Sequence, residues 1–251
     1  MATTGRARAR RTEPGSAGLV GTRLAMAGTV LYLLEWVAII GSSPAGPYGP
    51  GTATSQLLSD YSSHAGRAGT AAAWFSIVLI GRVLFVAAVR SSLRAQPRLL
   101  PVLDLALAAM AVGVVLEVTT YAVDAATARM AADGAGGAVV SALDQTAYWT
   151  NLLIAGPLGV AVLATSAAML RSRWYAGWLC WLGLGSGVVW LATALIGGVT
   201  YGTGDGIGAL DPAEAVGALS LWVWMLATGV VLWRARRGTS GAPAPGLDPA
   251  V

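Results

Sequence analysis

Six long apolar stretches constrain the fold of this chain more than any other sequence feature. They lie at about residues 20–41, 70–90, 100–123, 149–170, 177–198 and 213–233. Each is long enough to cross the hydrocarbon core of a bilayer, which takes roughly 20 helical residues. Because lipid offers no partners to backbone polar groups, such segments must satisfy their own hydrogen bonds as helices. The sequence therefore predicts an all-α, polytopic transmembrane helical bundle of about six spans.

Composition excludes an ordinary soluble domain. Hydrophobic residues make up 55% of the 251 positions and charged residues only 11%, whereas a soluble domain carries about 25% charged residues. The mean hydropathy of +0.64 points the same way. A net charge of +4 would suit a nucleic-acid partner. The basic residues instead follow the ends of the spans, so we expect contact with membrane lipid and no nucleic acid.

The arginines predict how the chain is threaded. The 16 basic residues are all arginine, and 13 of them flank the spans on one side. Positive residues favour the cytoplasmic side, which predicts two cytoplasmic termini and a location in the cell (inner or plasma) membrane. We expect a disordered arm at 1–19, a membrane domain at 20–234 and a disordered tail at 235–251. The flanking residues are Arg6, Arg8, Arg10, Arg11, Arg23, Arg90, Arg94, Arg98, Arg171, Arg173, Arg234, Arg236 and Arg237, against Arg67 and Arg129 on the other side.

Four ionisable residues fall inside the predicted spans: Glu35, Arg82, Asp104 and Glu117. Each costs roughly 2.5–3.5 kcal/mol at a helix centre, so each should face a partner or water rather than lipid. Counting residues from the span ends places Arg82 and Asp104 in the inner half of neighbouring helices. The sequence therefore predicts a structural ion pair between Arg82 and Asp104.

The two glutamates are then left without an evident cation. Glu117, Tyr121 and Asp124 are spaced i, i+4 and i+7, so they share one helix face that reaches the outer boundary. Burial and mutual repulsion would keep at least one carboxyl group protonated. The hypothesis is an outward-opening polar pocket; in the alternative, each acid only hydrogen-bonds a neighbouring helix. The predicted pocket residues are Trp36, Tyr121, Asp124 and Asn151.

Other motifs add little chemistry. One histidine, His64, and one cysteine, Cys180, leave scant material for a metal site or a histidine relay, so no metal and no cofactor is expected. The glycines of residues 183–187 superficially match a dinucleotide loop, but they lie inside a span with no preceding strand. They are interpreted as small residues that allow close helix approach.

Two segments carry a resemblance to a known group of proteins. The second span, WFSIVLIGRVLFVAAVRSSLR, and the start of the fifth, RSRWYAGWLCWLGLGSG, resemble bacterial six-span membrane proteins of unknown function that are common in actinobacteria. This resemblance implies architecture and no activity. The chain is also similar in size to small multi-span terpene cyclases, which protonate a prenyl substrate through intramembrane carboxyl groups. No motif of that family aligns here, so no residue roles are transferred.

Three classes of function remain open. The first is a non-catalytic scaffold, sensor or accessory subunit. The second is an intramembrane enzyme in which Glu35 or Glu117 acts as a general acid on a lipid or prenyl substrate. The third is a small transporter whose carboxyl groups relay protons. Besides membrane lipid, a hydrophobic small molecule and a second copy of the chain are the partners considered.

Overall fold

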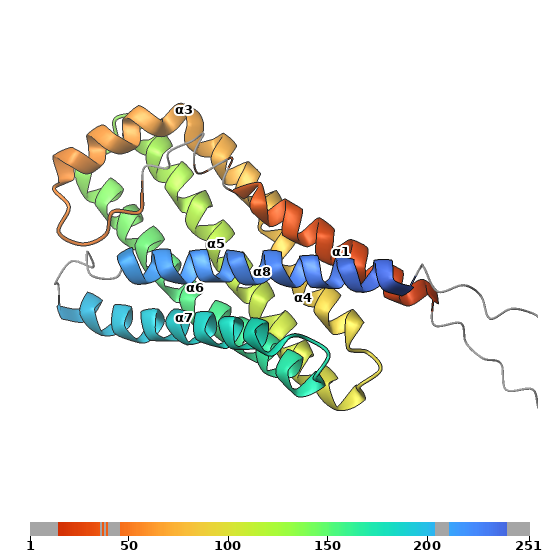
Figure 1. Cartoon of the computed structure of the whole chain (residues 1–251). Coiled ribbons are helices and arrows are strands. Elements are labelled where there is room, and N and C mark those ends of the chain that lie inside the picture. The colour runs from red at the N-terminus through yellow and green to blue at the C-terminus, as the bar shows by residue number, and fades with distance from the viewer. Residues whose placement is uncertain (1–14, 36, 38, 40–45, 204–210, 240–251) are drawn as a thin grey trace, which may run out of the picture.

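The computed structural model describes residues 15–35, 37, 39, 46–203 and 211–239, and within this part of the chain it contains helices and no strands (Figure 1). The helices are α1 (Gly15–Leu33), α3 (Thr54–Val78), α4 (Ile80–Ser92), the 3-10 turn η1 (Pro97–Leu99), α5 (Leu100–Ala132), α6 (Gly137–Ser172), α7 (Gly177–Thr203) and α8 (Asp211–Thr239). The all-helical architecture predicted from the apolar stretches is therefore confirmed.

Five helical segments of the described chain are long and apolar enough to cross a membrane. They are Thr54–Ser92, Pro97–Ala132, Gly137–Ser172, Gly177–Thr200 and Ala215–Arg234. A shorter apolar helix, Arg23–Leu33, covers part of the first predicted span. The second predicted span is built from α3 and α4, which meet at Leu79.

The helices pack as a ring in chain order. α1 packs against α4, the α3–α4 pair against α5, α5 against α6, α6 against α7 and α7 against α8, and α8 returns to α1. Side chains such as Phe85, Met110 and Trp224 are fully buried between them. Large apolar residues such as Leu195 and Val199 are exposed on the outside. An exposed apolar surface of this kind suits contact with lipid.

Two pairs of glycines set the closest helix crossings. A Cβ atom added at Gly28 of α1 would lie 2.6 Å from the carbonyl oxygen of Gly81 in α4. In the same way, a Cβ at Gly159 of α6 would lie 2.9 Å from the carbonyl oxygen of Gly187 in α7. Only residues without a side chain allow backbones to approach this closely. The second crossing confirms the interpretation of the 183–187 run as a packing feature.

Two connections between the predicted spans are largely helical. In the segment 42–69, α3 begins at Thr54 and continues into the second span, and the segment 124–148 is interrupted only between Ala132 and Gly137. Alanine-rich sequence forms helix readily but is less hydrophobic than a span core, so hydropathy ends the spans too early. The extensions form a second apolar cluster of Leu57, Tyr61, Ala128, Ala131 and Val140.

One end of the bundle collects the arginines and is called the basic end below. α1 begins there, α8 ends there, and the connections from α4 to α5 and from α6 to α7 lie there (Figure 1). Arg90, Arg98, Arg171 and Arg173 belong to this end. Most of the predicted arm and tail, residues 1–14 and 240–251, lies outside the described residues.

Candidate functional site

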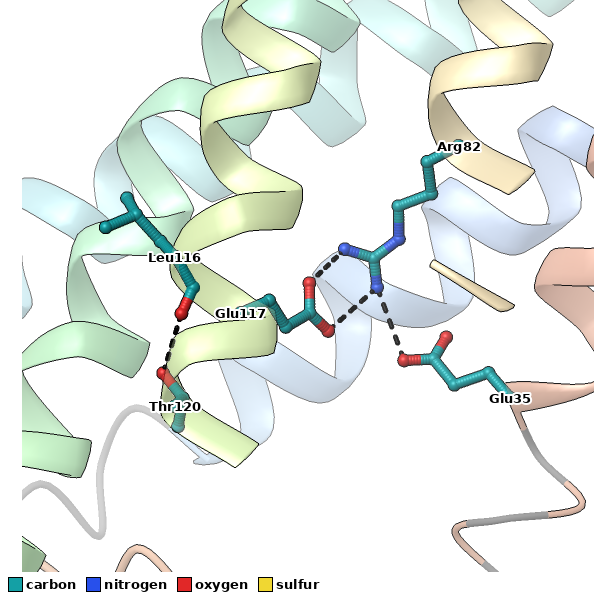
Figure 2. Close-up of polar contacts among 5 residues, drawn as sticks. All are labelled: Glu35, Arg82, Leu116, Glu117 and Thr120. Atoms are coloured by element: carbon teal, nitrogen blue, oxygen red, sulfur yellow. Dashed lines mark hydrogen bonds and ion pairs between the residues drawn. The ribbon is translucent and has the colours of Figure 1, made fainter. Parts of the chain in front are cut away.

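A buried arginine shared by two glutamates lies at the meeting point of α1, α4 and α5 (Figure 2). Arg82 forms a bidentate ion pair with Glu117: Nη1 contacts Oε2, and Nη2 donates to Oε1 over 3.1 Å. The same Nη2 donates to Oε1 of Glu35 over 3.4 Å. All three residues are at most 8% exposed. We call this group the charge cluster.

Helix direction explains why these three side chains converge. In an α-helix the side chains lean toward the N-terminus. α4 runs toward the basic end, so Arg82 leans away from it, whereas Glu35 and Glu117 lie on helices that run the other way and lean back toward it. Gly28 and Tyr32 of α1, and Glu35 two residues past the end of that helix, all pack against α4. The glycine crossing therefore holds the end of α1, and with it Glu35, close to α4.

Aromatic rings pack against the charge cluster and separate it from the apolar core. The ring of Tyr32 lies with its centroid 4.4 Å from Cζ of Arg82, which is a cation–π contact. Tyr121 stacks on Phe75 at 3.8 Å, with 7° between the ring planes. The Nε of Arg82 is buried and has no hydrogen-bond partner among the described residues. The guanidinium group is thus held by two carboxylates and a ring face, and its Nε–H has no partner among the described residues.

The predicted ion pair between Arg82 and Asp104 is wrong. Asp104 pairs with Arg90, and both of these side chains are substantially exposed near the basic end. The error came from counting helical positions without the direction in which the side chains lean. The prediction that the two glutamates lack a cation is wrong for the same reason, because Arg82 reaches both.

The residues predicted to line a pocket do not form a single group in the described structure. Tyr121 is half-buried beside the charge cluster, and Asp124 is buried one to two turns further along α5. Asn151 is half-buried in α6, and none of the hydrogen bonds in the described chain joins it to either glutamate. Trp36 lies outside the described residues. The predicted polar face of α5 is therefore real, whereas Asn151 is not joined to it.

The buried face of α5 changes from apolar to partly polar at the charge cluster. Toward the basic end its buried residues are apolar: Leu103, Ala106, Met110, Gly113 and Val114. From the cluster onward the buried set includes Glu117, Thr120, Asp124 and Thr127. The two threonine hydroxyls donate to carbonyl oxygens one turn back in the same helix, as Figure 2 shows for Thr120 and Leu116. Along α5, buried polar groups thus extend from the cluster toward the opposite end only.

A second polar group, the tyrosine–aspartate group, lies near that opposite end. Asp144 accepts hydrogen bonds from the backbone N–H groups of Tyr48 (2.9 Å) and Gly49 (3.0 Å) and from the hydroxyl of Tyr61 (2.7 Å). Desolvation, reinforced by the charge of Asp60, raises the pKa of Tyr48 to about 12. These contacts fasten the segment before α3 to α6.

The hydroxyl of Tyr61 also contacts Oδ1 of Asp124, over 3.2 Å. A phenol has one hydrogen to donate, and the shorter contact assigns it to Asp144. The contact with Asp124 is then a hydrogen bond only when Asp124 is protonated and donates. The other oxygen of Asp124 is buried and has no partner in the described part of the chain, which is costly for a carboxylate and less so for an acid. The arrangement fits a proton held between Asp124 and Tyr61.

Sequence reasoning missed three of these residues. Tyr32 could have been found, because it lies one turn from both Gly28 and Glu35 on the same face. Tyr61 and Asp144 fall between the predicted spans, and neither was predicted as a site residue. Their pairing needed the knowledge that α3, α5 and α6 continue as helices beyond the apolar core.

Replacing Asp144 with asparagine should weaken the tyrosine–aspartate group. The amide nitrogen cannot accept, so at least one of the three donors loses its partner, at a cost of about 1–3 kcal/mol. We expect a lower midpoint of thermal unfolding for the detergent-purified variant. Asp133→Asn is the control, because Asp133 forms an exposed pair with Arg129. Equal midpoints for the two variants would contradict the anchoring role of Asp144.

The fold and the site together define a helical membrane protein with a buried charge cluster. Within the described chain, no group of three or more His, Cys, Asp or Glu side chains is arranged to hold a metal ion. No family model, no curated protein and no solved structure matches the chain. Its function is therefore argued from the site alone.

Proposed function

We propose that this chain is a multi-pass cell-membrane protein, with both termini in the cytoplasm, that responds to protons through its charge cluster. The observation that carries the proposal is that two buried carboxylates share one arginine. With both glutamates ionised, the cluster has a net charge of −1 in a region of low dielectric constant. Uptake of one proton makes it neutral, which removes most of the cost of burial.

Glu35 is the group that exchanges the proton. Glu117 holds Arg82 with both carboxylate oxygens, the geometry that stabilises an ionised carboxylate best. Glu35 makes a single contact of 3.4 Å. The titratable and charged groups around it are Arg82 from α4, Tyr32 from its own helix, and Glu117 and Tyr121 from α5. Release of its proton would leave Glu35 as the less well compensated charge.

Along α5 the buried polar residues lie on one side of the cluster, which favours a sensor over a transporter. A transporter needs a polar path to both faces, whereas the buried face of α5 is apolar between the cluster and the basic end. On this helix polar residues lead only the other way, to Asp124, which contacts Tyr61. With the basic end in the cytoplasm, this route serves protons from outside. An enzyme is less well supported, since both glutamates already bind an arginine.

Glu35→Gln tests the proposal. For the wild type we expect the thermal unfolding midpoint in lipid nanodiscs to fall as the pH rises from about 5 to about 9, since proton release charges the cluster. For a chain of this size, each kcal/mol lost corresponds to roughly 2–4 °C. The neutral amide cannot release a proton, so the variant should lose this pH dependence and stay folded.

Asp104→Asn is the matched control, because it removes a carboxylate from α5 that lies outside the charge cluster. It should keep the pH dependence of the wild type. Infrared difference spectra give an independent reading: Glu35→Gln should remove a protonated carboxyl band, and Asp104→Asn should not. If Glu35→Gln retained both the band and the pH dependence, the proposal would be wrong.

A further inference from the structure

A basic hollow at the basic end is independent of the charge cluster. It has a volume of about 590 Å³ and lies between the connection at residues 95–98 and the end of α6 at residues 171–173. Arg98, Arg171 and Arg173 line it, and all three are exposed. None of the ion pairs in the described chain involves them, and Asp104, the described acid near this end, is engaged by Arg90. The hollow is therefore positively charged, and none of the described residues compensates this charge.

Contacts between the two connections give the hollow a fixed shape. The side chain of Gln96 donates to the carbonyl oxygen of Ser172 over 3.4 Å. The hydroxyls of Ser92 and Tyr175 lie 2.7 Å apart, and Tyr175 is buried. Arg173 ends α6 in a left-handed conformation with φ of 57°, which non-glycine residues adopt at a cost. A preformed concave site can bind a ligand without first ordering a loop.

Indole rings place this hollow at the level of lipid headgroups. Trp174 lies in the connection directly after Arg173, and Trp178 and Trp181 lie three residues apart on one face of α7. All three rings are strongly exposed, at 49%, 60% and 65%. Exposed tryptophans in a row at the end of an apolar helix are typical of the membrane interface. A soluble anion would not need this apolar border.

We infer that the basic hollow binds the phosphate headgroup of an anionic phospholipid. Guanidinium groups match phosphate oxygens in geometry and charge, and basic sites between membrane helices on the cytoplasmic side are suited to anionic headgroups. The exposed indoles beside the hollow would contact the interfacial part of the same lipid. If the three arginines served only to orient the chain, they would show no preference among lipids once the protein is inserted.

The test uses the purified full chain in neutral detergent, titrated with dioleoylphosphatidylglycerol or with dioleoylphosphatidylcholine. We expect the anionic lipid to raise the unfolding midpoint in a saturable manner and the zwitterionic lipid to have little effect. The double variant Arg171→Gln with Arg173→Gln should bind the anionic lipid about 25-fold more weakly, about fivefold for each arginine. The matched control is Arg67→Gln with Arg129→Gln, which removes two exposed arginines from the opposite end and should change nothing.

A lysine double variant and a titration with inorganic phosphate complete the test. Arg171→Lys with Arg173→Lys preserves the charge that orients the chain, and it should still weaken lipid binding several-fold because the bidentate geometry is lost. Inorganic phosphate at matched ionic strength should not reproduce the stabilisation. The inference would be overturned if the two double variants at Arg171 and Arg173, to glutamine and to lysine, bound the anionic lipid as tightly as the wild type. Equal stabilisation by free phosphate would also overturn it, by assigning the hollow to a soluble anion.

Discussion

Arg82→Met is expected to be the most destabilising single change in the membrane domain. It removes the only cation that contacts Glu117 and Glu35 in the described chain, and it leaves two carboxyl groups buried without a counter-charge. Removing one partner of a buried ion pair typically costs about 3–5 kcal/mol. Methionine keeps the unbranched apolar stem, so the loss would report charge rather than volume. The measurement is the unfolding midpoint in detergent, together with the yield of folded protein.

Rescue and control variants distinguish the effect of charge on stability from the effect of packing. Arg82→Met combined with Glu35→Gln and Glu117→Gln replaces every charge of the cluster with a neutral group of similar size, and it should recover most of the lost stability. Arg90→Met removes an arginine from the same helix whose ion pair is exposed, and it should have little effect. An Arg82→Met protein as stable as Arg90→Met would show that the cluster does not hold the helices together.

Gly81→Val is expected to separate α1 from α4 and to disable the charge cluster at the same time. A Cβ at Gly81 meets the backbone oxygen of Gly28 and lies 2.8 Å from the backbone nitrogen of Tyr32. Backbone atoms cannot turn aside as a flexible side chain can, so the helices must move. Overpacking typically costs about 1–3 kcal/mol and occasionally more. The shift would also move Glu35 away from Arg82, so pH dependence should be lost together with stability.

Gly185→Ala is the matched control for this crossing. Gly185 also lies inside an apolar helix, but a Cβ there meets nothing within 4 Å. Alanine should be neutral or stabilising by up to about 1 kcal/mol, because glycine is a poor helix former. Gly81→Ala gives a graded test with a single methyl group. If Gly81→Val and Gly185→Ala had similar stability, the close approach of α1 and α4 would not be needed for the fold.

The charge cluster shows how far sequence reasoning can reach. The three members of the charge cluster were singled out from the sequence, since a charged side chain in an apolar stretch is visible without a structure. The partner of Arg82 was predicted wrongly, because depth was counted only by residue position from the span ends. Arg82 leans away from the basic end and Glu117 leans toward it, so residues at different nominal depths meet.

The tyrosine–aspartate group lay beyond sequence reasoning for another reason. Asp124 was predicted as the outer end of a polar face, and that face is buried as expected. Asp144 and Tyr61 fell outside the predicted spans because alanine-rich helix is only weakly apolar. Their contact with Asp124 depends on the packing of α3, α5 and α6 beyond the apolar core, and periodicity within one helix does not report this packing.

The amino-acid sequence is enough to predict that the chain forms long apolar helices and that most of its arginines gather at one end of the bundle. Both are properties of single segments: apolar length selects lipid as the solvent, and flanking charge marks the ends of each helix. The packing of the helices was needed to show which acids share Arg82 and how closely α1 approaches α4. Those contacts depend on the direction of neighbouring helices, on glycines that face each other and on the reach of one long side chain, which are relations between segments far apart in the sequence.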